Sequence, residues 1–128
     1  MKKTFTRLLF FASLLLCGKA FSQSEATHFS PSINPPIPVQ LSAQNTISVS
    51  SIEGLSGTVK SVALTFSNSG KVQKTFGCIV KDKSGKIIYS VSGLVLNPGE
   101  SIGIADYKYS FNLPEGVKSS ELKTELTF

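Results

Sequence analysis

The chain has 128 residues, with 13 basic and 8 acidic side chains, two cysteines and no tryptophan. Four of the basic residues precede residue 23, so nine lysines stand against all eight acids in the remainder, a net charge of +1. This balance excludes a surface basic enough for nucleic acid or for an anionic membrane. The ~106 residues after position 22 suffice for one domain with one hydrophobic core.

Residues 1–22 have the pattern of a secretory signal peptide. Lys2, Lys3 and Arg7 precede an apolar run from Leu8 to Leu16, which is too short to span a bilayer. The sequence Ala20-Phe21-Ser22 then places small residues at the −3 and −1 positions of a cleavage site. We expect cleavage after Ser22 and a secreted or periplasmic protein.

An alternative interpretation of the same segment uses Cys17. The sequence from Leu14 to Gly18 is similar to a lipobox, whose cysteine is lipidated and becomes the first residue of the mature chain. Leu16 precedes this cysteine, where glycine, alanine or serine is usual. Lipidation at Cys17 would make the protein a membrane-anchored lipoprotein, and we expect no membrane contact without it.

Residues 23–43 are predicted to form an extended leader or tether. Four of the six prolines lie here, and proline fixes φ and donates no hydrogen bond to a sheet. Ile33, Ile37 and Val39 could nevertheless dock along a sheet edge. His28, the only histidine, has no cysteine or carboxylate at ligand spacing and is interpreted as a solvated loop residue.

Residues 44–128 are predicted to be an all-β domain, an immunoglobulin-like antiparallel β-sandwich of about seven strands. The strands alternate apolar and polar residues, and turn sequences rich in Gly, Asn, Asp and Pro separate them. We expect strands over Thr46–Ile52, Thr58–Ser67, Gln73–Lys81, Lys86–Gly93, Ser101–Leu113 and Glu121–Phe128, with Leu94–Leu96 leading into the turn at Asn97. The inward sets in the centre are Val62, Leu64 and Phe66; Phe76, Cys78 and Val80; and Ile87, Tyr89 and Val91.

Two changes of phase predict irregularities in these strands. Val59 is out of phase with Val62, which indicates a bulge or bend near Lys60. Ile104 and Tyr107 have opposite parity, so we expect a break at Ala105-Asp106, either a bulge or a crossing between two sheets. In the last strand we expect Leu122, Leu126 and Phe128 to face inward.

The turns resemble those of small immunoglobulin-like sandwiches in bacterial envelope proteins, of the CARDB and FxLYD types. Asn68-Ser69-Gly70, Asp82-Lys83-Ser84-Gly85-Lys86 and Leu96-Asn97-Pro98-Gly99-Glu100 follow the order of an "N-x-G" turn, a "D-x-x-G-K" hairpin and an "L-x-P-G-E" turn. The match covers 61–104 and concerns turn chemistry. The resemblance implies an adhesion, spacer or assembly module without a shared catalytic site.

No catalytic or metal-binding pattern is found, so we expect a non-enzymatic protein without a cofactor. No G-x-S-x-G and no glycine-rich phosphate loop is present, and Asp82, Glu100 and Asp106 fall in separate turns. Beyond the signal only Cys78 remains, so an internal disulfide is impossible. Its parity favours a buried hydrophobe, the alternatives being a reactive thiol or an intermolecular bridge.

The sequence leaves three hypotheses for function, and an enzyme ranks after all three. The first is an exported interaction or structural module whose partner, an envelope protein or a glycan, is unknown. The second is a carbohydrate- or small-ligand-binding module that uses an aromatic strip of Tyr107 and Tyr109, with Tyr89 as a further candidate. The third is assembly by strand addition, in which the 33–39 leader or the last strand pairs with a neighbour's sheet edge.

Overall fold

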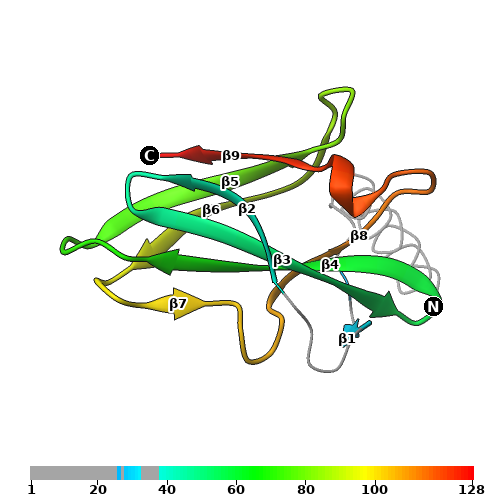
Figure 1. The fold of residues 1–128 in the computed structure, drawn as a ribbon, viewed down its shortest axis with the longest axis horizontal. Helices are drawn as coiled ribbons and strands as arrows, with labels where there is room; N and C mark the ends of the chain where they lie inside the picture. Colours follow the sequence, from blue (N-terminus) through cyan, green and yellow to red (C-terminus); the bar gives the residue numbers. More distant parts are fainter. Residues whose placement is uncertain (1–25, 27, 33–37) are drawn as a thin grey trace, which may run out of the picture.

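The computed structural model describes residues 26, 28–32 and 38–128, and these form an all-β protein of two antiparallel sheets (Figure 1). The predicted signal peptide 1–22 with Cys17, and residues 23–25, 27 and 33–37 of the predicted leader, lie outside the described residues. Within the described part, no helix is long and apolar enough to cross a membrane.

The larger sheet is built on a regular hairpin of two long strands, β3 (Ile47–Ser56) and β4 (Val59–Asn68). Two short strands, β1 (Ser30–Pro31) and β2 (Val39–Gln44), pair one after the other with the outer edge of β3. In the same way, β7 (Ser101–Ile102) and β8 (Tyr109–Asn112) pair with the outer edge of β4.

The smaller sheet has the order β6-β5-β9, with β5 (Lys74–Lys81) in the centre, β6 (Ile87–Leu96) on one edge and β9 (Lys123–Thr127) on the other. A 3-10 turn, η1 (Ser119–Glu121), leads into β9. The described residues form nine strands where about seven were predicted; because β1 and β2 share one edge and β7 and β8 share another, the nine occupy seven positions.

The pairing order follows the immunoglobulin pattern, in which strands A, B and E form one sheet and C, F and G form part of the other. β3, β4 and β8 take the places of A, B and E, whereas β5 and β9 take those of C and F. Within the described residues, β9 pairs with β5 alone, so the place of strand G beside β9 is not filled by hydrogen bonding. Instead, β2 adds to β3, and its Ser42 contacts Thr124 of β9.

The core lies between the sheets and is filled by the inward sets of β3 to β6, β8 and β9. Phe66 and Phe111 are its largest fully buried side chains. Phe66 contacts Phe76 across the sandwich, with ring centroids 5.6 Å apart, so the two sheets are joined by aromatic packing. The core residues are Ile47, Val49, Val62, Leu64, Phe66, Phe76, Cys78, Val80, Ile88, Tyr89, Leu94, Leu96, Phe111, Leu113, Leu122 and Leu126.

The expected bulge near Lys60 is wrong, because β3 and β4 pair without a register shift from Ile47↔Asn68 to Ser56↔Val59. Val59 shares the outward parity of the strand and is 44% exposed. The bulges lie elsewhere, two of them between β5 and β6. One of them inserts an extra residue near Ile88, which changes the phase; Ile87, expected inward, is therefore 51% exposed and Ile88 is buried.

The break expected at Ala105-Asp106 is confirmed as an excursion within one sheet. β7 and β8 both pair with β4, and the chain loops out over 103–108 between them, so the alternative of a crossing between sheets is wrong. Near the C-terminus, Leu122 and Leu126 face the core as expected. Phe128 does not, because it follows the end of β9 and is 54% exposed.

Candidate functional site

An interruption in the strand pairing along β3 creates a pocket on one side of the sandwich. β1 pairs with β3 at Leu55 and Gly54, whereas β2 pairs with the part of β3 from Ile47 to Ser51. Between these two segments, Ser32 donates hydrogen bonds from its backbone N (3.2 Å) and its Oγ (2.8 Å) to the Glu53 carbonyl. Among the described residues, the edge of β3 therefore lacks a ladder partner at residues 52 and 53, on the side that faces η1.

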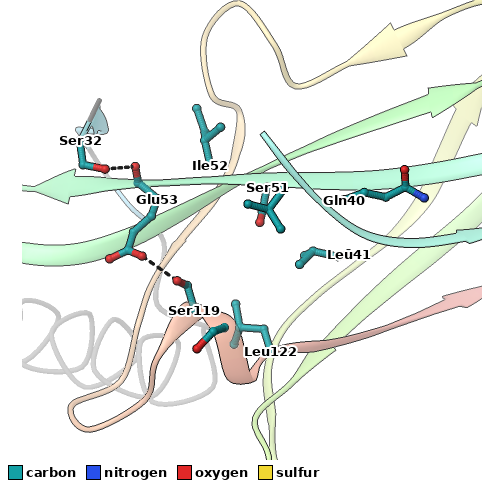
Figure 2. Close-up of a pocket in the computed structure, with 10 residues that line it drawn as sticks. Ser32, Gln40, Leu41, Ser51, Ile52, Glu53, Ser119 and Leu122 are labelled. Atoms are coloured by element: carbon teal, nitrogen blue, oxygen red, sulfur yellow. Dashed lines mark hydrogen bonds between the residues drawn. The ribbon is translucent and has the colours of Figure 1, made fainter. Parts of the chain in front are cut away.

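The pocket has a volume of about 490 Å³ and lies between β2, β3 and η1 (Figure 2). It is lined by Ser32, Val39, Gln40, Leu41, Ser51, Ile52, Glu53, Ser119, Ser120 and Leu122. A register shift between Gln40 and Ser42 leaves Leu41 without a partner on β3, and Leu41 packs against the core. The lining therefore combines apolar side chains with hydroxyl, amide and carboxylate groups.

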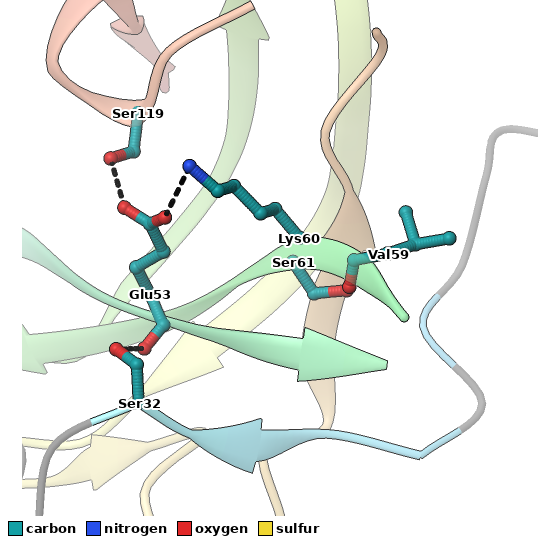
Figure 3. A network of polar contacts seen from close by, with 6 residues as sticks. All are labelled: Ser32, Glu53, Val59, Lys60, Ser61 and Ser119. Carbon is teal, nitrogen blue, oxygen red and sulfur yellow. Dashed lines mark hydrogen bonds and ion pairs between the residues drawn. The ribbon is translucent and has the colours of Figure 1, made fainter. Parts of the chain in front are cut away.

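Glu53 joins β3 to η1 and to the residue that follows β1 (Figure 3). Its Oε2 accepts a hydrogen bond of 2.6 Å from Ser119 Oγ on η1, while its carbonyl holds Ser32 beside β1. Lys60 Nζ lies 3.9 Å from Oε1 and is 71% exposed, so this ion pair adds little stability. The inward parity of β3 runs through Ile47, Val49 and Ser51 to Glu53, which places the carboxylate at the opening of the sandwich.

A glycine allows the N-terminal segment to lie close against this sheet. A Cβ at Gly54 would overlap the Ser30 carbonyl and the Phe29 ring. The Phe29 ring in turn contacts Tyr107, with centroids 4.8 Å apart. Residues 28–32 are therefore held against the larger sheet beside the pocket.

The lining of the pocket offers hydrogen-bonding groups beside apolar side chains. Among the described residues of its lining there is no histidine, cysteine or lysine, and the one carboxylate accepts a hydrogen bond from Ser119. Among the described residues, no group of three or more His, Cys, Asp or Glu side chains could hold a metal ion. Hydroxyl and backbone groups next to leucine and isoleucine side chains offer the partners that a polypeptide segment requires.

The three tyrosines singled out from the sequence do not form one surface. Tyr89 is buried on β6 and stacks on Phe111 of β8 at 4.8 Å and 17°. Tyr109 is half-buried, edge-on to Phe66 at 5.5 Å, and Lys108 Nζ lies 5.6 Å from its ring centre. Tyr107 lies in the 103–108 loop with φ +51° and packs on Phe29.

Cys78 is fully buried in the centre of β5, as its parity predicted. Burial raises the pKa of its thiol to about 12, because the thiolate would be poorly solvated there. The native thiol is therefore a core side chain with little nucleophilic character near neutral pH. The buried position of Cys78 does not support the alternative that it is a reactive thiol.

The sequence analysis missed Glu53, Ser119 and Leu41 as site residues. One signal was available, since Glu53 continues the inward parity of Ile47 and Val49 beyond the expected end of that strand.

Comparison of the chain with protein-family models, curated proteins and solved structures found no match.

Proposed function

We propose that this protein is an exported, non-enzymatic β-sandwich that acts as an interaction module and binds extended polypeptide. The binding surface, here called the open side, consists of β2, the β3 edge at 51–53, η1 and β9. The N-terminal pattern of 1–22 supports export, and the resemblance of the turns to envelope sandwiches supports a module of this class.

The observation that carries the proposal is the incomplete pairing on the open side. In the described residues, β9 has a strand partner on one edge only, and the partners of β3 leave a gap above the pocket. Main-chain donors and acceptors at a sheet edge form hydrogen bonds with an added strand, while adjacent pockets select its side chains. A polypeptide is thus the ligand that uses the edge and the pocket together.

The aromatic contacts disfavour a carbohydrate-binding strip. Sugar platforms need an exposed ring face, yet Tyr89 is stacked in the core, the Tyr107 ring packs at a tilt against Phe29, and Tyr109 contacts Phe66 and Lys108. These contacts explain the three rings as structural residues.

Photo-crosslinking in exporting cells tests the proposal. A photoreactive residue replaces Ser120 or Lys123 on the open side, or Ser92 on the far edge of the smaller sheet as control. We expect crosslinks to one polypeptide from the open side only. A synthetic peptide of the crosslinked segment should then protect β9 amides from hydrogen exchange in the purified protein. Equal crosslinking from Ser92, or a peptide that leaves the β9 amides unprotected, would contradict the proposal, whereas glycan adducts would favour the carbohydrate alternative.

A further inference from the structure

The connection between β2 and β3 is a two-residue turn in a strained conformation. Gln44 pairs with Ile47, and between them Asn45 has φ +51° and Thr46 has φ +69°. A tight hairpin of this kind needs left-handed backbone at both positions, which suits Asn-Gly sequences. Asn45 fits this requirement. Thr46 does not, because a β-branched side chain is strongly disfavoured at positive φ.

Contacts outside the hairpin hold Thr46 in this conformation. Its Oγ1 donates a 2.9 Å hydrogen bond to Asn68 Oδ1, and its carbonyl accepts one of 3.0 Å from Ser69 N. Asn68 is the last residue of β4, and Ser69 begins the turn that follows it. The hairpin conformation is thus stabilised by hydrogen bonds to Asn68 and Ser69, and not by the intrinsic preference of its own residues.

The strand that precedes this hinge is weakly held. Four of the six residues of β2 are exposed, and its backbone pairs with β3 alone. Leu41 packs against the core, Ser42 Oγ accepts one 2.7 Å hydrogen bond from Thr124 Oγ1, and the pocket lies beneath the start of the strand. A second copy of the chain would offer β2 the same contacts on its own β3 and β9.

We propose that β1 and β2 exchange between two copies of this chain, forming a reciprocal dimer. The Asn45–Thr46 hinge opens so that β2 and β3 become one continuous strand, and each β2 then takes the place on the partner's open side that the partner's own β2 has left. Opening releases the left-handed conformation in both hinges, while identical strand contacts form again across the two-fold axis. This inference rests on the proposed function in one respect, since it uses the same open side.

The opposite edge of the sandwich is less suited to a second copy. β6 is ten residues long and carries no charge, but two register shifts interrupt its pairing with β5. Bulges of this kind twist an edge and hinder the addition of another strand. The open side is therefore the edge at which self-association is expected.

Disulfide trapping distinguishes exchange from a closed monomer. In S42C/T124C the new cysteines replace hydroxyls 2.7 Å apart, which lie within one chain in the closed form and in two chains in the exchanged form. The matched control is S67C/S101C, a pair of hydroxyls also 2.7 Å apart, between β4 and β7, which stay in one chain in both forms. Cys78 is buried and does not compete.

After oxidation of the exported protein across a concentration series, we expect S42C/T124C to give covalent dimers whose fraction rises with concentration. The control should give internal disulfides only. Thr46→Gly should weaken the dimer about tenfold, because glycine adopts the hinge conformation without strain. Deletion of Thr46, which leaves too few residues for the tight turn, should increase the dimer fraction.

Internal disulfides alone in S42C/T124C at the highest concentration, even after refolding at that concentration, would overturn the exchange. Equal dimer formation by both cysteine pairs would overturn it as well. Either result leaves the crosslinking test at Ser120 and Lys123 unaffected. Conversely, dimers without any crosslinked foreign polypeptide would support the exchange and remove the proposed partner.

Discussion

The two long sides of the sandwich are closed by different chemistry. On the side of β6 and β8, the Tyr89 ring lies flat on Phe111, 4.8 Å away, and the Tyr109 ring contacts Phe66. On the open side, the sheets are joined by hydroxyl contacts, Ser42 with Thr124 and Ser119 with Glu53, around a pocket of about 490 Å³. One side is closed by aromatic burial and the other by exchangeable polar contacts.

This difference separates stability from availability for binding. Aromatic burial removes a large apolar area from water, and its loss leaves a cavity. A hydroxyl pair contributes little net free energy, since water replaces either partner. The aromatic side should therefore account for most of the stability, while the open side should yield at small cost to a competing strand.

The largest expected effect is that of Phe111→Ala on the aromatic side. Phe111 is fully buried and supports Tyr89, so its truncation should lower the free energy of unfolding by about 3–5 kcal/mol. Urea denaturation measures this change. Phe128→Ala, which removes a phenylalanine ring that is 54% exposed, is the control and should cost less than about 1 kcal/mol. Similar losses for both variants would contradict the assignment of stability to this side.

Asn68→Ala should cost about 2–4 kcal/mol, because the buried amide joins four segments. Its Nδ2 donates to the Val72 and Leu96 carbonyls at 2.9 and 3.1 Å, and its Oδ1 accepts from Thr46 and from the Gly70 N–H. The Leu96 carbonyl would lose a buried partner, and the other three groups would lose a partly buried one. Thermal and urea denaturation measure the change.

Asn112→Ala provides the comparison for Asn68. The Asn112 side chain accepts one hydrogen bond of 2.8 Å, from Ser61 Oγ, and should cost about 1 kcal/mol. If the loss of unfolding free energy in Asn68→Ala were no larger than that in Asn112→Ala, water would have entered and replaced the hydrogen bonds of the Asn68 amide.

The fold class could be predicted from the sequence because alternation and turn residues are local signals. Strand boundaries near Lys81 and Phe66 followed directly from them. The phase of β6 could not be predicted, because the extra residue near Ile88 depends on the register of its pairing with β5, which no local pattern fixes. The supposed bulge at Lys60 arose from reading the exposed Val59 as a core residue.

The open side could be anticipated only in part. The suggestion that Val39 docks along a sheet edge agrees with the pairing of β2, yet the pocket depends on where β1 and β2 stop along β3. That position follows from the Leu41 shift and from Ser32 reaching Glu53, both of which are tertiary. The surroundings of the candidate tyrosines also depend on tertiary contacts, since Tyr107 packs on Phe29 and Tyr89 stacks on Phe111.

Leu41→Ala measures how firmly the open side is closed. Leu41 is half-buried, so we expect a loss of about 1 kcal/mol, well below that of Phe111→Ala. The same variant should raise hydrogen exchange in β2 more than in β8. Val39→Ala, at a position 60% exposed, is the matched control and should have almost no effect. A loss comparable to that at Phe111 would show that the two sides are equally stabilising.

Asp82 should give the smallest effect, confined to acid conditions, at the hairpin that begins β6. Its Oδ1 accepts hydrogen bonds from Ser84 Oγ (2.6 Å), Ser84 N (2.9 Å) and Lys86 N (3.0 Å), and the Ser84 hydroxyl is the main cause that lowers the pKa of this carboxyl. Because the folded-state pKa lies below the unfolded value, the charged form contributes stability that is complete above about pH 4 and is lost as the pH falls through the folded-state value.

Asp82→Asn keeps the acceptor oxygen and removes the charge, so its urea midpoint should lie slightly below that of the native protein at pH 6. The two midpoints should converge as the pH is lowered from 6 toward 2, because protonation of Asp82 removes the charge that the variant lacks. Asp106→Asn, on the exposed 103–108 loop with one hydrogen bond from Lys108 N at 3.2 Å, is the control. A gap at pH 6 that persists unchanged at pH 2 would assign the effect to hairpin geometry. Convergence would assign the effect to the charge of Asp82. The small size of the effect would show that this turn contributes far less to the free energy of unfolding than the aromatic contacts of Tyr89 and Phe111.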